Sequence, residues 1–569
     1  MKNYELKKMQ RSSYLIGKAF KNYLAASILT VAATQVASIV DAAIVGNIIG
    51  PEGLAAVNLS RPILQTVYAI SCLYIASSTM LAGMAIGNGN KAQADKLFTF
   101  SLLTSLVIGV LLILVGLLAF DSLSSLLCKS DNLRPLTNDF MFVTILSVLP
   151  QLLMYTLHQF VTVDGSPKAV SKAVIVGNVV NLALDLFLIK VCGMGIAGAA
   201  WATFVMYIVC CVMVLPHFRR KGTLRINVPR LKDIETGRIM TFGLPLFFGT
   251  VLLSVQYVGN NYVSSTYLGD GGLIAMAVCM QLFALSMVIL TGTLRTIQPV
   301  GSILTGLGDN RGMVFLIKRA YSFMGICLAI YAIAISLFPN QIAQFLGADN
   351  ESSLPIIMSA LPAYSLHIIM QALQYNLIPV YQFYGHKNLA LFISIGQTLL
   401  PMFGFWALKG GWTGFFIGQV VVAVVLLIST TYIRSKDKSV YPLLLIPKTE
   451  PKDVFDVTIE TNTDALAECR KNIGSFLMDH GIEADKVNRL MLCVEELAKN
   501  IIQHGHARYI DIRATDSVIS LHDDGKPFNP LEYEGGDETF GLKIVHGFMP
   551  DMKYDYRFNQ NMVRMDISH

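Results

Sequence analysis

Charged residues are scarce in this chain of 569 residues. Asp, Glu, Lys and Arg make up only 14% of it, whereas hydrophobic residues make up 53%. Soluble domains carry about 25% charged residues, so the composition excludes an ordinary soluble protein and predicts a membrane protein with several spans. The net charge of +6 does not indicate a nucleic-acid partner, because the basic residues fall mostly in loops between apolar segments.

Three kinds of motif are also missing. The phosphate loop GxxxxGK[ST] does not occur, so ATP is not expected to power transport directly. The nine cysteines show neither metal-ligand spacing nor a disulfide framework, and small apolar packing residues describe them best. The N-terminal segment has no short apolar core that ends at a small-residue cleavage site, so we expect no cleavable signal peptide.

Twelve apolar segments are present, each about the 20 residues that a helix needs to cross a bilayer. Loops after even-numbered segments, counted with the adjoining segment ends, hold fifteen Lys and Arg residues, and loops after odd-numbered segments, counted in the same way, hold four. Positive loops stay in the cytoplasm, which predicts a multi-pass protein of the plasma membrane with both termini cytoplasmic. The segments run approximately over 23–48, 55–86, 98–120, 136–161, 169–191, 195–216, 239–267, 273–304, 317–338, 354–383, 388–408 and 412–434.

The chain repeats itself at an offset of 219 residues. IGPEGLAAV at 49–57 aligns with LGDGGLIAM at 268–276, and the glycines of IGNGNK align with those of TGLGDN. Two like-oriented halves with the substrate site between them are a common transporter plan. We therefore expect a mainly α fold with twelve transmembrane helices in two pseudo-repeated six-helix lobes. The expected units are a lobe at 12–218, a cytoplasmic loop at 219–238, a lobe at 239–436, a charged linker at 437–452 and a soluble domain at 453–569.

Two acidic residues lie inside apolar segments, Asp41 in VASIVDAAIVGNIIG and Asp185 in GNVVNLALDLFLI. A carboxylate at membrane depth costs several kcal/mol and marks a functional site by default. The pair therefore suggests cation binding or proton relay. The alternative is that each is an interior acid satisfied by backbone or amide partners. Asn181 lies four residues before Asp185 and so shares its helix face.

The order and spacing of several motifs in this region resemble the multidrug and toxic compound extrusion family, over about residues 12–436. The runs are VDAAIVGNIIGPEGLAAVNLSRPI, IGNGNK, VDGSPKAVSKAVIVGNVVNLALDLFLI and GMGIAGAAWATFVMYIV. The resemblance implies a V-shaped, two-lobed antiporter that exchanges Na⁺ or H⁺ for bulky, amphipathic and often cationic compounds. It also implies that Asp41, Asn181, Asp185 and Thr203 form the cation site of the N-terminal lobe. Binding of the ion would neutralise the acids, lower the affinity for a cationic solute and release it outward.

The C-terminal half departs from a second acidic site. At the repeat offset, neutral Asn260 takes the place of Asp41, with Gln256 and Gln281 nearby. Met276, Met280, Phe283 and Met287 suit an adaptable apolar cavity, although simple packing is the commoner role of such side chains. Arg61, Arg295, His158 and His367 also fall in or near spans and are not assigned to a site.

The soluble tail has its own pattern. Residues 483–505 predict an amphipathic helix with an apolar stripe along one face. Glu496, Asn500 and His504 lie along another face of the same helix. Strand-like segments follow in RYIDIRATD, SVISLHDDG, MKYDYRF and NMVRMDIS, with a second helix in LKIVHGFM. These elements predict a small α+β two-layer sandwich.

The tail resembles the histidine-kinase-like ATP-binding domain of the anti-sigma-factor serine kinase type, over about 453–569. Through EELAKN, the resemblance makes Glu496 the candidate catalytic base and Asn500 a ligand of Mg²⁺. Through DDGKPFNP and FGLKIV, it makes Asp523, Gly525 and Gly541 nucleotide-binding residues. Thr539 stands where a first glycine is usual, so ATP binding is expected more firmly than hydrolysis or serine kinase activity.

Together the two resemblances predict a secondary antiporter with a cytoplasmic nucleotide-binding regulatory domain. Its expected partners are small-molecule substrates, the lipid bilayer and a cytoplasmic protein bound by the tail. Two alternatives stay open. One is a lipid-linked precursor flippase, which would need several cavity cations, whereas only Arg61 and Arg295 are available. The other is a membrane-tethered signalling protein that uses the tail as a kinase or docking module.

Overall fold

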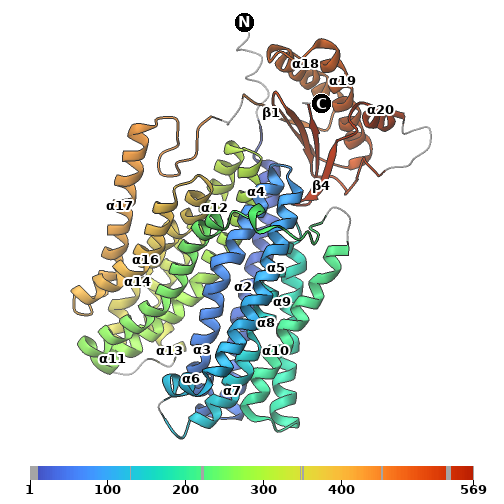
Figure 1. Cartoon of the computed structure of the whole chain (residues 1–569). Coiled ribbons are helices and arrows are strands. Elements are labelled where there is room, and N and C mark those ends of the chain that lie inside the picture. The colour runs from blue at the N-terminus through green and yellow to red at the C-terminus, as the bar shows by residue number, and fades with distance from the viewer. Residues whose placement is uncertain are drawn as a thin grey trace.

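The computed structural model joins a long helical bundle to a small sheet domain at one end (Figure 1). It describes residues 11–128, 130–219, 223–346, 348, 352–449, 453–532 and 540–567. Within these residues, ten helices are long and apolar enough to cross a membrane, or eleven if the bent pair Arg134–Leu146 and Val148–Val163 counts as one span. This confirms the mainly α, multi-pass architecture.

The N-terminal half of the bundle is a series of helices with two π-helical turns, at Cys72–Ala76 and Phe187–Val191. Its helix α5 exposes a stripe of large aliphatic side chains, as a face turned toward lipid requires. The elements are α2 (Tyr14–Ile48), α3 (Pro51–Ser71), η1 (Cys72–Ala76), α4 (Ser77–Gly87), α5 (Lys91–Leu118), α6 (Phe120–Leu127), α7 (Arg134–Leu146), α8 (Val148–Val163), α9 (Pro167–Leu186), η2 (Phe187–Val191), α10 (Gly195–Val214) and η3 (Leu215–Arg219).

The C-terminal half begins after the short turn η4 (Leu231–Asp233) with α11 (Thr236–Gly306). At 71 residues α11 is far too long for one span of about 20, and Gly269 breaks it with φ 65°. Both ends of α11 line one cavity, so the helix doubles back at this break. Counting it as two spans supports the expected twelve, which, like the two-lobed arrangement, stays a prediction. The remaining helices are α12 (Asn310–Leu337), α13 (Pro339–Phe345), α14 (Leu354–Tyr375), α15 (Leu377–Phe383), α16 (Lys387–Ala407) and α17 (Thr413–Lys436).

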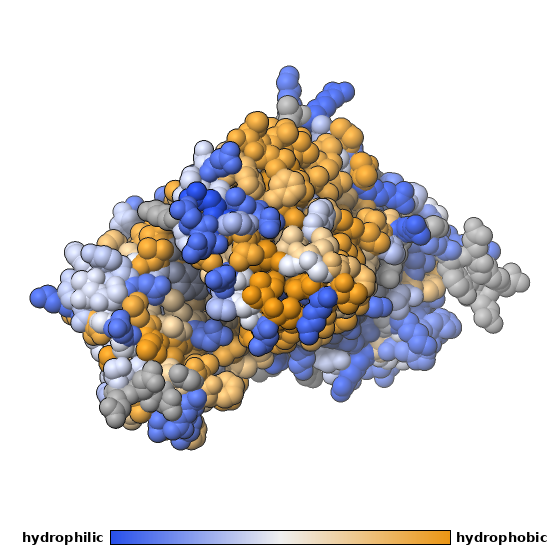
Figure 2. Space-filling view, turned by 90° about the horizontal axis from the view of Figure 1, so that it is seen from below, coloured by the Kyte–Doolittle hydropathy of each residue, from blue (hydrophilic) through white to orange (hydrophobic). Residues whose placement is uncertain are grey.

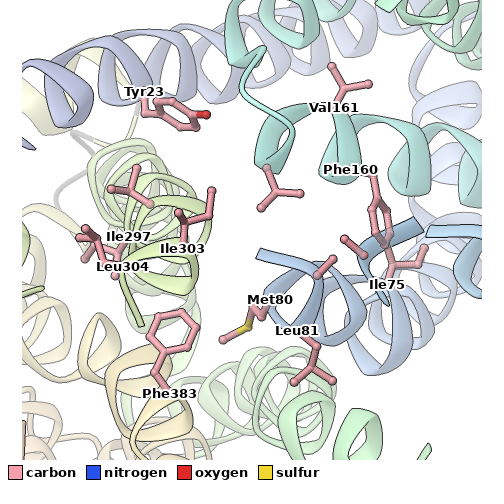
Figure 3. Packing of buried hydrophobic residues seen from close by; sticks show 14 of the residues in the cluster. Tyr23, Ile75, Met80, Leu81, Phe160, Val161, Ile297, Ile303, Leu304 and Phe383 are labelled. Atoms are coloured by element: carbon pink, nitrogen blue, oxygen red, sulfur yellow. The ribbon is translucent and has the colours of Figure 1, made fainter. Parts of the chain in front are cut away.

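The two halves meet in a shared hydrophobic core near the sheet domain. Side chains from α2, η1, α4 and α8 pack there with side chains from α11 and α15 (Figure 3). The backbones approach closely, since a Cβ on Gly87 would lie 2.1 Å from the carbonyl oxygen of Ile303, and a Cβ on Gly306 would lie 2.1 Å from that of Met84. Glycine at these positions lets α4 and α11 close this end of the bundle.

The C-terminal domain is a five-stranded antiparallel sheet in the order β1-β2-β3-β5-β4, with three helices packed on one face. This arrangement agrees with the expected two-layer sandwich (Figure 1). The sequence analysis did not predict β1 or α18. A signal for α18 was present, because Asn462 is an N-cap residue whose side-chain oxygen accepts from the Ala465 N–H. The elements are β1 (Phe455–Glu460), α18 (Thr463–Asp479), α19 (Ala484–Asn500), η5 (Ile501–Gly505), β2 (Tyr509–Ala514), β3 (Val518–Asp523), α20 (Phe540–Phe548), β4 (Lys553–Arg557) and β5 (Gln560–Asp566).

Candidate functional site

Asp41 on α2 and Asp185 on α9 lie beside each other and interact directly. Asp185 is completely buried, whereas Asp41 is half-buried. Both carboxylate oxygens of Asp185 and one of Asp41 lack a hydrogen-bond donor. The exposed guanidinium of Arg61 interacts with Asp41 electrostatically. Two adjacent carboxyl groups without donors require a cation or a proton between them, because like charges this close repel strongly in a medium of low dielectric constant.

The other two residues expected at this site lie on neighbouring turns. Asn181 is buried one helical turn from Asp185, and its amide nitrogen has no acceptor. The hydroxyl of Thr203 on α10 donates to the carbonyl of Ala199, 3.2 Å away. The Thr203 hydroxyl is therefore hydrogen-bonded within its own helix, and its role as a cation ligand stays a prediction. The carboxyl pair itself offers the hard oxygen ligands that Na⁺ prefers and fits a shared proton equally well.

Two cavities of 330 and 240 Å³ lie among the helices and share four lining residues, Tyr68, Tyr155, Gln159 and Arg295. The larger cavity lies between the halves of the bundle, because its walls come from α2, α3 and α8 on one side and from α11, α14 and α16 on the other. Figure 2 shows the end of the molecule away from the C-terminal domain, where the surface is hollowed between hydrophobic areas.

At the repeat position, Asn260 and Gln256 are both buried, and the Asn260 amide oxygen has no donor. Met276 and Phe283 are buried in a core cluster of the C-terminal half, against which Met280 and Met287 also pack. Of these four, Phe283 and Met287 line the 330 Å³ cavity. Phe283 and Met287 are thus cavity residues, whereas Met276 and Met280 contribute to packing.

In the C-terminal domain, α19 carries the two residues expected to handle ATP and Mg²⁺. Asn500 donates through its amide to the carbonyl of Glu496, 2.8 Å away, which leaves the Asn500 amide oxygen available for a metal ion. The carboxylate of Glu496 contacts Gly541 at the start of α20, where a Cβ would lie 2.1 Å from Oε2. The structure thus brings Glu496 and Gly541 together. Thr539 lies outside the described residues.

Asp523 ends β3 as a buried acid held by neutral donors. Its Oδ1 accepts from the backbone N–H of Gly525 at 2.8 Å and from the Asn561 amide at 2.9 Å. Burial raises the pKa of Asp523. A Cβ on Gly525 would lie 2.4 Å from the carbonyl oxygen of Gly505, so a glycine is required where this loop meets the end of η5. His504, exposed in η5, has no contact that assigns it a role.

The outer face of the sheet carries a set of buried charges that contact the helical bundle. Arg11, which precedes α2, pairs with Asp309 at 2.7 Å and with Asp456 at 3.0 Å. Arg513 on β2 pairs with the same Asp309 at 3.2 Å. Burial alone would raise the pKa of Asp309, but the two guanidinium groups hold it below its ordinary value. Burial raises the pKa of Asp511 to about 7 and also raises that of Asp456.

A second group of contacts joins the sheet domain to the N-terminal half. Arg557 on β4 pairs with Asp164 at 3.0 Å, and the His217 ring nitrogen lies 2.8 Å from the same carboxylate. Lys18 on α2 pairs with Asp524 at 2.7 Å. Prediction from the sequence missed these residues, because pairs so distant in the chain show no local pattern. Asp524 alone lies in a motif that the sequence analysis singled out, DDGKPFNP, where it directly follows Asp523.

Comparison with known families and structures agrees with this architecture. Residues 26–187 match the MatE family, and residues 459–567 match the histidine kinase-like ATPase domain. The chain joins a MatE transporter domain to a histidine kinase-like ATPase domain. The multidrug export protein MepA of Staphylococcus haemolyticus is 23% identical over 301 residues, which cover 52% of this chain and 66% of that protein. MepA of Staphylococcus aureus strain RF122 is 20% identical over the same proportions.

Solved structures show the same fold in the MatE part. An outward-facing multidrug resistance MATE family transporter of the MOP superfamily superposes with a TM-score of 0.67 at 20% identity, covering 75% of this chain and 99% of that one. A MOP superfamily transporter from Pyrococcus furiosus superposes with a TM-score of 0.66 at 20% identity, covering 76% and 99%. The histidine kinase-like ATPase domain is thus an addition to a complete transporter fold.

Proposed function

We propose that this protein is a secondary antiporter that exports amphipathic organic compounds in exchange for Na⁺ or H⁺. The observation that carries the proposal is the contact between Asp41 and Asp185, in which Asp185 is fully buried without a donor. Burial without hydrogen-bond donors makes the charge of the pair costly. An ion from outside removes that cost, so the pair takes up Na⁺ or H⁺ readily and can exchange it.

Transport follows from this exchange. A bound ion neutralises the pair and draws α2 and α9 together, which changes the shape of the N-terminal half. The solute leaves outward as the ion enters, and return of the ion to the cytoplasm resets the pair. The energy comes from the ion gradient, since one charge that moves through 100 mV releases about 2.3 kcal/mol.

The test is flux in proteoliposomes with separately imposed Na⁺ and pH gradients. Asp41→Asn and Asp185→Asn should each abolish gradient-driven export. Asp121→Asn, which removes an exposed acid on α6, is the matched control and should export like the parent. Equal export by the parent and both pair variants would overturn the proposal.

The histidine kinase-like ATPase domain, in this proposal, binds ATP with Mg²⁺ and regulates transport. Its support is the arrangement of Glu496, Asn500 and Gly541 at one place on α19 and α20. Extensive ion pairing with the bundle favours regulation of the attached transporter over an independent signalling role. ATP should therefore change the export rate without replacing the ion gradient. Export driven by ATP alone would contradict this role.

A further inference from the structure

Arg295 occupies an unusual position at the junction of the two cavities. It lines both of them, together with Tyr68, Tyr155 and Gln159. It precedes the end of α11 at Gly306 by eleven residues, which is roughly 16 Å at 1.5 Å per residue. That distance is about half of a hydrocarbon layer 30 Å thick. Arg295 thus lies well inside the apolar span that the sequence predicts at 273–304.

The charge of Arg295 has no counterion among the described residues. Neither cavity is lined by an Asp or Glu, and Arg295 is the one Lys or Arg in either lining. Its electrostatic neighbours include the phenols of Tyr68, Tyr155 and Tyr375. A guanidinium at this depth is costly unless an anion joins it, and its planar fork of donors matches a carboxylate or phosphate.

The rest of the larger cavity suits an amphipathic solute. Gln371 and Gln397 are buried there, and each has an amide oxygen without a donor, which can accept from a hydroxyl or amino group. Phe283 and Met287 supply apolar contact surface. The lining therefore combines one fixed positive charge, hydrogen-bonding amides and aromatic rings.

We propose that Arg295 binds an anionic group of the exported solute, so that the substrates are amphipathic organic anions or zwitterions. This inference rests on the proposed export function, but binding can be measured without transport. Two xanthene dyes form a matched pair of probes, since fluorescein is an anion and rhodamine 6G is a cation. Fluorescence anisotropy with the purified full chain gives their affinities, and proteoliposome flux gives their transport.

Arg295→Gln should weaken fluorescein binding at least tenfold, while rhodamine 6G binding stays the same or tightens. Arg295→Lys should recover part of the fluorescein affinity, because it restores the charge. Arg225→Gln, an exposed loop position, is the control for simple loss of charge and should change neither affinity. Equal loss of both dyes in Arg295→Gln, or tighter binding of rhodamine 6G by the parent, would overturn the inference.

Two further measurements separate the sources of failure. If fluorescein binds through Arg295 but no dye moves under an ion gradient, the antiport proposal fails and the anion site stands. A fluorescent phosphatidylserine in the same vesicles distinguishes a lipid headgroup from a soluble anion. Arg295-dependent movement of the lipid alone would support anion recognition with the lipid as its source.

A second, independent inference concerns the ion pairs that join the C-terminal domain to both halves of the bundle. The C-terminal domain holds the N-terminal half through Arg557–Asp164 and Lys18–Asp524. It holds the C-terminal half through Arg513, which pairs with Asp309 and donates to the Gly308 carbonyl at 2.9 Å. Arg11 then joins Asp309 to Asp456. Every acid in these pairs is at most 4% exposed.

This domain therefore bridges the end at which α4 and α11 close against each other. Opening that end must separate Gly87 from Ile303 and must also break the ion pairs with one half. Lys18 reaches Asp524, which lies beside the proposed nucleotide residues Asp523 and Gly525. A nucleotide bound here, which rests on the function proposed above, would act directly on one of the bridging contacts.

We infer that the histidine kinase-like domain is a lock that keeps the cytoplasmic end closed, and that nucleotide binding shifts the lock through Lys18–Asp524. Hydrogen exchange of the full chain tests it. The double variant Arg513→Gln/Arg557→Gln should raise amide exchange at least fivefold at 84–91 and 303–309. Arg489→Gln, an exposed charge on α19, should leave it unchanged.

A nonhydrolysable ATP analogue with Mg²⁺ should change exchange at the same peptides in the parent but not in Lys18→Gln. Asp309→Asn repeats the test from the bundle side, because Asp309 is the partner of Arg513. In every variant, amide exchange at 490–498 in α19 shows whether the C-terminal domain is still folded. Unchanged exchange at 84–91 and 303–309 in both kinds of variant would overturn the lock. Loss of ion-driven export would leave these exchange results intact, because they do not depend on transport.

Discussion

The Asp41–Asp185 pair and the acids at the domain interface differ in their partners. Asp185 is fully buried beside another acid, and its carboxylate oxygens accept no hydrogen bond. Asp309 is equally hidden, yet it pairs with two guanidinium groups and accepts from the Gly312 N–H at 2.7 Å. One bundle thus contains buried acids that are fully matched and buried acids that are not.

The comparison separates structural charges from exchangeable ones. A buried ion pair fixes the geometry of its two elements, because removing one partner leaves an uncompensated charge. A pair of acids without donors stabilises nothing until an ion arrives. The first arrangement suits a contact that holds two elements together, such as Arg557–Asp164, and the second suits binding and release of an ion.

The largest difference should appear in transport. Asp185→Asn should lower ion-driven export at least a hundredfold, because the amide cannot take up a proton or balance a cation. Its unfolding temperature should stay the same or rise, since the like-charge contact disappears. Asp309→Asn should keep a measurable export rate but unfold at a lower temperature. Proteoliposome flux and thermal unfolding of the same preparations give both quantities, and the opposite assignment of effects would reverse the comparison.

The next effect concerns stability at the interface. Asp164→Asn should destabilise the docked state by about 3 kcal/mol, because it removes the bundle's carboxylate from the buried guanidinium of Arg557 and leaves that group paired with Asp555 of its own domain. Exchange of the peptide 160–166 should rise together with that of 553–560. Asp131→Asn, at an exposed ion pair, is a matched control with an expected effect below about 1 kcal/mol. Equal effects of the two variants would show that burial at this contact is unimportant.

Asp523 is an intermediate case, because neutral donors hold it. Asp523→Asn should weaken Mg-ATP binding about tenfold, which is about 1.4 kcal/mol, while the domain stays folded. Asn500→Ala should weaken binding of Mg-ATP more than binding of ATP in EDTA, because it removes the proposed metal ligand. Titration with a fluorescent ATP analogue measures both, and Lys471→Ala on α18 is a control. Unchanged affinity in both variants would remove these residues from the site.

Local pattern predicted much of this molecule. Apolar length gave the helices, and the acids Asp41 and Asp185 were conspicuous because charge is rare in such segments. Their contact between α2 and α9 depends on tertiary structure. The family resemblance implied it, whereas the spacing of the residues along the chain could not. In the C-terminal domain, the alternation in β2 and β3 predicted strands, whereas β1 and α18 were missed beside a charged linker.

The interface with the C-terminal domain was beyond prediction from single positions. Arg11, Asp309 and Asp456 come from three distant segments, and each would be an ordinary surface charge in isolation. Only folding shows that these charges neutralise one another. Arg295 was visible as a charge in a span, but the absence of any acid in the surrounding walls required the cavity to be known.

The last expected effect is a pH dependence at the interface. Burial raises the pKa of Asp511 to about 7 from an ordinary value of 3.8, beside Arg11, Asp456 and Asp309. The Asp511 carboxyl is then protonated when folded and ionised when unfolded between about pH 4 and pH 7. Its contribution to stability is therefore fully present below pH 4 and is lost as the pH rises through 7.

Asp511→Asn should remove this dependence, because an amide does not titrate but can still accept from the Thr458 hydroxyl, 2.6 Å away in the parent. Each pKa unit corresponds to about 1.4 kcal/mol, and the pKa of about 7 lies two units above pH 5, so we expect a change of about 3 kcal/mol between pH 5 and pH 8. The measurement is the unfolding temperature of parent and variant at pH 5 and pH 8. A parent that is more stable at pH 8 than at pH 5, relative to the variant, would mean that Asp511 belongs with the fully matched acids.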